Sequence, residues 1–335
     1  MKILYSYEIG PYLESSITSG SLGIFSLLYI FILSVFLLSH WPKFLNIFFA
    51  AFTVRALAIV IGNYITPLPD STGDANTFAH FAWIWSLNGL PNVISDFPGI
   101  SVKFMTWFIA VIYSIFGKSL MMAQSLSLLF GIASVFLGWR LAYKIWGEKV
   151  AMKVGWLLAL FPSLVLYSSL TLRESYSWFF FVVALNGVYN WSKYGGFKNI
   201  VIGFLGFLGA TFFHGGMFVG LIAFLIIVTI TSIKKFYSFK NNTINFKSLF
   251  IVFVIIIGST YYITGQVHLP KLGTFTEAID SERLIKMTSH TSRGDAAYPK
   301  WMEINKPVEF IYKTPIRATY FLFSPLPWDI KKIIH

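Results

Sequence analysis

Long apolar blocks are the feature that most constrains the structure of this chain. A helix needs roughly 20 residues to cross the hydrocarbon core of a bilayer, which is about 30 Å thick, and blocks near that length recur along the sequence. The pattern predicts an all-α fold, a polytopic transmembrane helical bundle. We expect membrane spans at residues 21–39, 44–65, 119–139, 154–171, 175–191, 199–213, 216–233 and 248–264.

The composition excludes a soluble domain and a nucleic-acid-binding module. Only 12% of the 335 residues are charged and 56% are hydrophobic, whereas about a quarter of the residues in a soluble domain are charged. The formal net charge is +12, but Lys and Arg interrupt the apolar blocks instead of covering one polar face, so we expect no nucleic acid partner. The chain has no Cys, which excludes disulfides and thiolate metal sites.

The placement of charge predicts the orientation in the membrane, because cytoplasmic loops collect Lys and Arg. The loop at residues 66–102 is acidic and contains no Lys or Arg, so we expect it on the extracytoplasmic side. The apolar segment at residues 104–116 is too short for a span, and we expect it to lie at the outer surface or to dip into it. Two loops collect basic residues, and we expect both on the cytoplasmic side. One contains Arg140, Lys144, Lys149 and Lys153, and the other contains Lys234, Lys235, Lys240 and Lys247.

The sequence divides into three regions. Residues 1–264 form the expected bundle, and the lack of a basic n-region followed by a cleavage site argues against a cleaved signal peptide. Residues 265–315 are polar and mix acids with bases, which indicates one extracytoplasmic segment. Residues 316–335 begin a further apolar block, which we expect a longer relative to continue.

An acidic motif, Asp70-Ser-Thr-Gly-Asp74, follows the second span. Behind it, Phe78, Phe81, Ala82 and Trp85 recur at helical spacing, which predicts an amphipathic helix in the membrane interface. Asp74 either caps this helix by accepting backbone N–H groups or faces a ligand. The residues alone leave both interpretations open.

Other charged residues are candidates because a charge near apolar spans needs a partner. Arg55 lies mid-span, where it pairs with an acid inside the bundle or meets a ligand. Arg173 and Glu174 lie between two spans on the side of Asp74; neighbours on a helix point in different directions, so we expect them to serve different partners, unless they form a solvated turn. His214 ends a span and is a hydrogen bonder or a ligand contact.

The outer polar segment contains a cluster of bases that could hold a phosphate by charge-assisted hydrogen bonds or form a solvated face. These residues are Arg283, Lys286, His290 and Arg293. The sequence has no His/Glu metal spacing, no phosphate-loop glycine pattern and no serine-nucleophile elbow. It therefore requires no cofactor and predicts no metal site.

The order of these features resembles the GT-C fold membrane glycosyltransferases. The likeness spans about residues 44–231. Within the GT-C fold, the chain more specifically resembles the family 39 type, the protein mannosyltransferase and aminoarabinose transferase group. Its motifs are Phe48-Phe-Ala-Ala-Phe-Thr-Val-Arg55-Ala-Leu-Ala, Asp74 with Phe78 and Ala82, Leu160-Phe-Pro162, Tyr167-Ser168 and Glu174. The chain departs from the family at His214, where an Arg is common, in an additional N-terminal span and in the lack of a C-terminal bundle.

The resemblance implies a reaction and roles for these residues. A sugar would move from a polyprenyl-phosphate donor to a glycan or lipid acceptor at the outer face of the bacterial cytoplasmic (inner) membrane. Asp74 would be the catalytic base, with Asp70 as second choice, and Glu174 would line the active site. Arg173, His214, Arg283 or Arg293 would hold phosphate, while Arg55 would support the bundle from beneath. Some proteins of this fold use a divalent cation, so the resemblance leaves room for one.

Two other functions fit the same sequence. An O-antigen or capsule repeat-unit polymerase is also a multispan protein that uses lipid-linked sugars at the outer face. A transporter or flippase for lipid-linked sugar would use Arg55 and the outer acids to line a pathway. Transporters often contain internal repeats, and this sequence has none that we detect.

Overall fold

The computed structural model describes residues 17–101, 103–236, 260, 263–265, 274, 276–277, 280–290 and 299–323. All regular elements in these ranges are helical, and they confirm the predicted all-α helical membrane bundle. The chain forms two compact units, residues 1–249 and residues 250–335.

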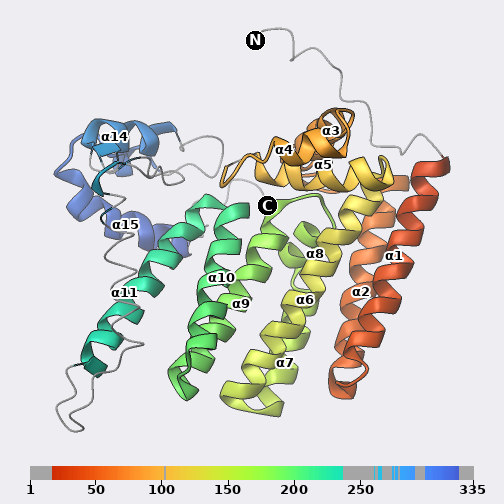
Figure 1. Ribbon diagram of the computed structural model, residues 1–335, viewed down its shortest axis with the longest axis horizontal. Helices are drawn as coiled ribbons and strands as arrows, with labels where there is room; N and C mark the ends of the chain where they lie inside the picture. The colour runs from red at the N-terminus through yellow and green to blue at the C-terminus, as the bar shows by residue number, and fades with distance from the viewer. Residues whose placement is uncertain are drawn as a thin grey trace. The chain divides into compact units, whose positions relative to one another are not determined.

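The first unit is built on helices that run side by side (Figure 1). The helix α11 follows a short 3₁₀ turn, η1 (Gly215–Met217). The side-by-side helices are α1 (Ile17–Leu38), α2 (Pro42–Tyr64), α6 (Leu120–Trp146), α7 (Glu148–Leu160), α9 (Arg173–Tyr194), α10 (Phe197–Phe213) and α11 (Phe218–Phe236).

Three of the described helices are long and apolar enough to cross a membrane: Ser19–Leu38, α2 and α6. The predicted span at residues 154–171 is broken instead. The helices α7 and α8 (Pro162–Ser168) meet at an angle of 56°, and together they would make a fourth span. Pro162 explains the break, because proline lacks the N–H that would continue α7 but fits the first turn of a new helix.

The remaining predicted spans fall short of that standard. The helix α10 and the segment Gly215–Thr231 have 10–17 residues, and α9 has 22 residues but contains many polar side chains. Residues 248–264 lie largely outside the described residues. By length and composition the described part therefore contains three to four candidate spans, where the sequence predicted seven in the same residues.

Short helices lie across one end of the bundle (Figure 1). They are α3 (Asp74–Ser86), α4 (Leu90–Ser95) and α5 (Phe104–Phe116). The helix α5 packs against α3, so the segment at residues 104–116 lies at the end of the bundle, as its length predicted. Phe78 and Ala82 of α3 are buried in the cluster that joins these helices, but Phe81, expected on the same face, is 43% exposed.

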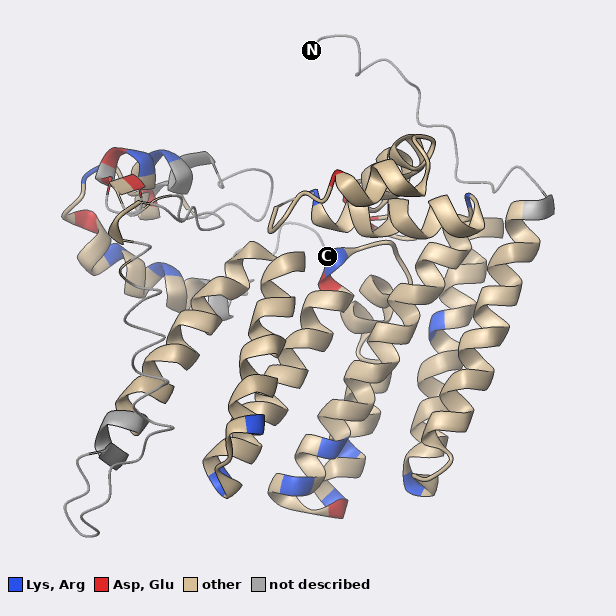
Figure 2. Cartoon of the chain, in the orientation of Figure 1, with Lys and Arg blue, Asp and Glu red and all other residues tan. Residues whose placement is uncertain are grey.

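The opposite end of the bundle is basic (Figure 2). Lys43 at the start of α2 pairs with Glu148 at the start of α7, with Nζ and Oε2 2.6 Å apart. Lys144 in the last turn of α6 donates a hydrogen bond to Asn190 near the end of α9. Because α9 ends here and begins at Arg173, Arg173 lies at the other end, with α3.

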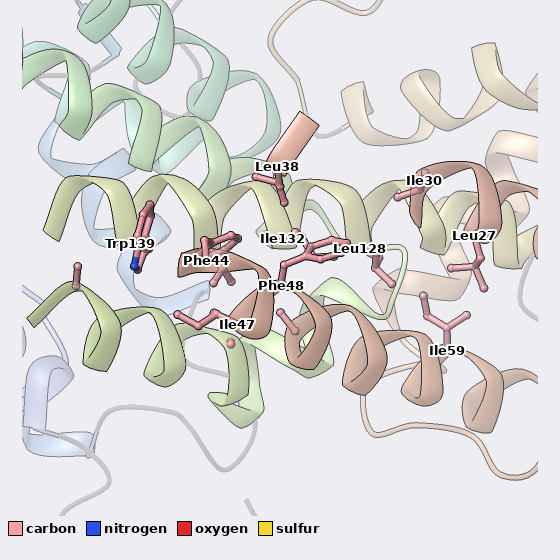
Figure 3. Close-up of a cluster of buried hydrophobic side chains, with 14 of the residues drawn as sticks. Leu27, Ile30, Leu38, Phe44, Ile47, Phe48, Ile59, Leu128, Ile132 and Trp139 are labelled. Atoms are coloured by element: carbon pink, nitrogen blue, oxygen red, sulfur yellow. The ribbon is translucent and has the colours of Figure 1, made fainter. Parts of the chain in front are cut away.

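Packing inside the first unit relies on aromatic rings and on close helix contacts. Phe44, Phe48 and Trp139 belong to the cluster between α1, α2, α6 and α7 (Figure 3). The helices α9 and α10 approach so closely that a Cβ on Gly206 would strike the backbone nitrogen of Ala184. Small residues at such contacts are typical of membrane helix pairs.

The second unit contains α14 (Ser281–His290), a 3₁₀ turn η2 (Lys300–Met302) and α15 (Glu309–Phe323). Glu309 accepts a hydrogen bond from the backbone N–H of Asn305, 2.8 Å away, and pairs with Lys313 at 3.0 Å. These contacts, the backbone bond first, lower the pKa of Glu309.

Candidate functional site

Asp74 is the first residue of α3, and its side chain does not cap the helix. The N-cap position belongs to Gly73, and no side-chain hydrogen bond caps the helix there. The N-cap interpretation of Asp74 is therefore wrong. Its side chain is 69% exposed at the end of the bundle opposite the basic one, where the positive end of the α3 dipole favours a carboxylate.

Arg173 lies between two carboxylates. Its Nη2 atom is 4.0 Å from Oδ2 of Asp74, and its Nε atom is 3.6 Å from Oε1 of Glu174. The guanidinium also lies over the ring of Phe78, 6.0 Å from its centroid. The expectation that Arg173 and Glu174 serve different partners is thus wrong, because the flexible arginine side chain reaches both its own neighbour and α3.

A buried hydrogen bond holds the starts of α3 and α9 together. The hydroxyl of Thr171, 1% exposed, donates to the backbone carbonyl of Ala75 at 2.7 Å. Thr171 lies two residues before Arg173 and Ala75 lies one residue after Asp74, so this bond holds together the two backbone segments that carry the charged groups. A second bond, from the Ser175 hydroxyl to the Tyr167 carbonyl at 2.9 Å, joins the first turn of α9 to α8.

A polar pocket of about 430 Å³ opens beside these groups. It brings together both aspartates of the sequence motif and Glu174. Asp70 has a φ angle of 60°, in the left-handed region that few non-glycine residues adopt, so the loop is tightly turned at this wall. The residues that line the pocket are Asp70, Thr72, Gly73, Asp74, Tyr167, Leu172 and Glu174.

A second, mainly apolar cavity of about 310 Å³ lies between α6, α8, α9 and η1. Two residues, Tyr167 and Glu174, line both this cavity and the polar pocket. The Oε2 atom of Glu174 is buried and has no hydrogen-bond partner among the described residues. The other residues lining the cavity are Arg55, Gly131, Ser134, Val135, Leu164, Ser168, Ser175, Ser177, Trp178, His214 and Met217.

Arg55 lines this cavity and does not form the ion pair that was one of the two contacts the sequence suggested. It is fully buried, and none of the ion pairs in the described residues involves it. Its Nε atom donates to the Ser168 hydroxyl at 2.8 Å, and Nη1 donates to the carbonyls of Ala159 at 2.7 Å and Ala51 at 3.1 Å.

The partners of Arg55 explain why a charge is tolerated in the bundle. Ala159 and Leu158, which accepts a longer bond of 3.4 Å from Nη2, are at the end of α7. Carbonyls in the last turn lack helical partners and carry the negative end of the helix dipole. Arg55 therefore stabilises the end of α7 and, through Ser168, the following helix α8.

The structure gathers some of the predicted site residues and not others. Asp70, Asp74 and Glu174 line the polar pocket, Arg173 bridges two of them, and His214 lines the apolar cavity. Arg283 belongs to the second unit, where its guanidinium pairs with Glu277. Arg293 lies outside the described residues. Among the described residues, no three His, Asp or Glu side chains gather as metal ligands.

Sequence analysis missed the residues that hold the site in place. Thr171 joins the starts of α3 and α9 and was not noted, while Ser168, which holds α8 to Arg55, and Tyr167 were noted only as part of a motif. Their signal was a run of hydroxyl residues, Tyr167-Ser168-Ser-Leu-Thr171, inside a segment otherwise apolar enough to span. Polar groups in such a segment need hydrogen-bond partners, which makes them candidates for structural or functional contacts.

Fold and site define a class, an all-α helical membrane protein with a cluster of charged residues at one end of its bundle. No protein-family model matches the chain, and no curated protein or solved structure is significantly similar to it.

Proposed function

We propose that this chain is a membrane glycosyltransferase that moves a sugar from a polyprenyl-phosphate donor to an acceptor hydroxyl at the extracytoplasmic face of a bacterial cytoplasmic membrane. The observation that carries the proposal is that Tyr167 and Glu174 line two spaces at once. One is a polar pocket that contains Asp70 and Asp74, and the other is an apolar cavity among the helices. A lipid-linked sugar needs both environments within one molecule's length.

The two spaces suit the two substrates. An isoprenoid chain is apolar and fits the cavity between α6, α8 and α9, while hydroxyl-rich acceptors fit the polar pocket. The pocket lies at the end of the bundle opposite the basic one, which favours the extracytoplasmic side. A sugar that arrives already linked to lipid phosphate needs no nucleotide in the pocket.

The chemistry assigns a role to each charged group. The Asp74 carboxylate takes the proton of an acceptor hydroxyl, whose oxygen forms a bond to the anomeric carbon while the bond from that carbon to the phosphate oxygen breaks. Polyprenyl phosphate leaves with the bonding electrons, and the configuration inverts. Arg173, which lies within 4.0 Å of both Asp74 and Glu174, steadies the growing phosphate charge. Glu174 orients the sugar or the acceptor.

Mass spectrometry of glycans tests the proposal in cells. Lipid-linked and surface glycans are compared between cells with and without the protein, and we expect a difference of one sugar. Asp74→Asn, present in the membrane at the wild-type level, should abolish that difference, and Asp70→Asn should reduce it less. If the Asp74→Asn protein transfers sugar at the wild-type rate, the assignment of the base is wrong.

Asp96 offers a matched control for these variants. It is an acid near the same end of the bundle, but it lines neither space and accepts a hydrogen bond from Nε1 of Trp85 at 3.2 Å. We expect Asp96→Asn to retain transfer. A loss equal to that of Asp74→Asn would indicate a general charge effect instead of a specific base.

The rival functions predict different products. A repeat-unit polymerase would join preassembled oligosaccharides on lipid diphosphate and would leave monosaccharide lipids unused. A flippase would move lipid-linked sugar across vesicles without forming a glycosidic bond. Purified protein in vesicles, given each lipid in turn, separates the three.

A further inference from the structure

Tyr167 occupies a place in the site to which the reaction above gives no role. It is the only aromatic residue that lines both the polar pocket and the apolar cavity among the described residues. A lipid-linked sugar that occupied both spaces would lie against the residues that line both. The residue at this point is therefore well placed to contact the group between lipid phosphate and acceptor, which is the sugar itself.

The backbone of Tyr167 is held from two directions. Its carbonyl accepts a hydrogen bond from Ser175 at 2.9 Å. The next residue, Ser168, accepts one from the buried guanidinium of Arg55 at 2.8 Å. The side chain packs against the small buried cluster of Ala75, Leu170 and Leu172. These contacts restrict the backbone and one side of the ring, which reduces the freedom that the residue loses when a ligand binds.

The chemistry of the Tyr167 side chain fits a sugar ring. A pyranose presents a face of C–H groups and a rim of hydroxyls, which an aromatic ring with a polar end matches on both counts. No hydrogen bond joins the Tyr167 hydroxyl to other described residues. Beside it, Glu174 has a carboxylate oxygen without a hydrogen-bond partner in the described part of the chain, a strong acceptor for sugar hydroxyls.

We infer that Tyr167 packs against the sugar ring of the lipid-linked donor and, with Glu174, determines which sugar is accepted. The inference rests on the proposed function. It adds a specificity-determining residue to that function and locates the sugar at the junction of the two spaces. The lipid then extends along the apolar cavity, and the acceptor approaches from the polar pocket.

A binding experiment tests the inference without catalysis. Full-length protein carrying Asp74→Asn is placed in nanodiscs, and its affinity is measured for sugarless polyprenyl phosphate and for polyprenyl phosphates bearing glucose, mannose, galactose or aminoarabinose. We expect one sugar-bearing lipid to bind about ten- to a hundredfold more tightly than the sugarless one, as a packed ring and one or two hydrogen bonds provide. Adding Tyr167→Ala should abolish this preference and leave the affinity for the sugarless lipid unchanged.

Two further variants separate sugar contact from a structural role. Tyr167→Phe keeps the ring and should retain most of the preference. Trp178 lines only the apolar cavity, so Trp178→Ala should weaken binding of both lipids by the same factor. If Tyr167→Ala also weakens both equally, or leaves the preference intact, the inference is overturned while the proposed function stands. If none of these lipid phosphates binds the protein that carries Asp74→Asn alone, the proposed function fails and the inference fails with it.

Discussion

Replacing Arg55 by Lys keeps the buried charge and changes only the geometry of its donors. The guanidinium of Arg55 reaches Ser168 on α8 and the carbonyls of Leu158 and Ala159 at the end of α7 at the same time. The ammonium of Lys is a compact group that cannot span both helices, and it is more strongly hydrated than a guanidinium. Both differences destabilise the variant.

The size of the effect follows from the bonds that are lost. A hydrogen bond to a charged group contributes about 1.5–3 kcal/mol, and a buried carbonyl left without a donor costs about 1–3 kcal/mol. Arg55→Lys loses at least one of the two short bonds, to Ser168 at 2.8 Å or to Ala159 at 2.7 Å, and leaves one partner unsatisfied. Because both figures describe the same lost bond, we expect the free energy of unfolding to fall by about 1.5–3 kcal/mol.

Reversible unfolding of the full-length protein in lipid bicelles measures this quantity. Arg140, exposed and stacked over Trp41, supplies an Arg→Lys control, for which we expect a change within about 1 kcal/mol, the size of an exposed cation–π contact. A double-mutant cycle of Arg55→Lys with Ser168→Ala should yield a coupling energy above about 1 kcal/mol, because the two groups share one bond. An Arg55→Lys protein as stable as the wild type would refute the reasoning.

Three other measurements check separate parts of the structure. Gly131→Ala should destabilise the protein and weaken the Arg55–Ser168 coupling, because the added Cβ would lie 2.5 Å from Cβ of Ser168; an unchanged coupling energy would contradict this packing. Arg173→Gln should lower sugar transfer about 10²–10³-fold and Arg173→Lys less, as measured by release of polyprenyl phosphate, because removal of a preorganised cation raises the transition-state energy; equal rates for the two variants would argue against a role of the positive charge. Contacts in the folded state lower the pKa of Glu309, so its ionised form stabilises the start of α15 at pH values above the pKa of Glu309 in the unfolded chain. This contribution disappears as the pH falls through the folded pKa. Amide hydrogen exchange at the start of α15 should therefore accelerate at acid pH in the wild type and be insensitive to this titration in Glu309→Gln.

The sequence predicted best those helices for which the number of consecutive apolar residues determines whether they can cross the membrane. The spans expected at residues 21–39, 44–65 and 119–139 correspond to α1, α2 and α6. The short segment at residues 104–116 was also placed correctly at one end of the bundle, because 13 residues cannot cross about 30 Å. In both cases a local property, the number of consecutive apolar residues, determines the structure.

The contacts of the site depend on tertiary structure, and the sequence could predict them only in part. Charge placement put Asp74, Arg173 and Glu174 on one side of the membrane, but nothing local indicated that Arg173 bridges the two acids. The same holds for Arg55. Its position in a span predicted a need for partners. Those partners are backbone carbonyls at the end of another helix, and every residue type has such a carbonyl, so the sequence could not identify them.

The bend at Pro162 connects the scaffold to the candidate site. Residues 148–168 as one straight helix would extend about 31 Å at 1.5 Å per residue, enough to carry α8 through the membrane in line with α7. The break turns α8 by 56° instead and exposes the last carbonyls of α7, which Arg55 then satisfies. The same guanidinium donates to Ser168, the residue after Tyr167. The break between α7 and α8 therefore helps to position Tyr167, which lines both spaces. Pro162→Ala, which favours a continuous helix, should therefore both abolish the preference among lipid-linked sugars and lower the stability, because the last carbonyls of α7 would no longer accept from Arg55.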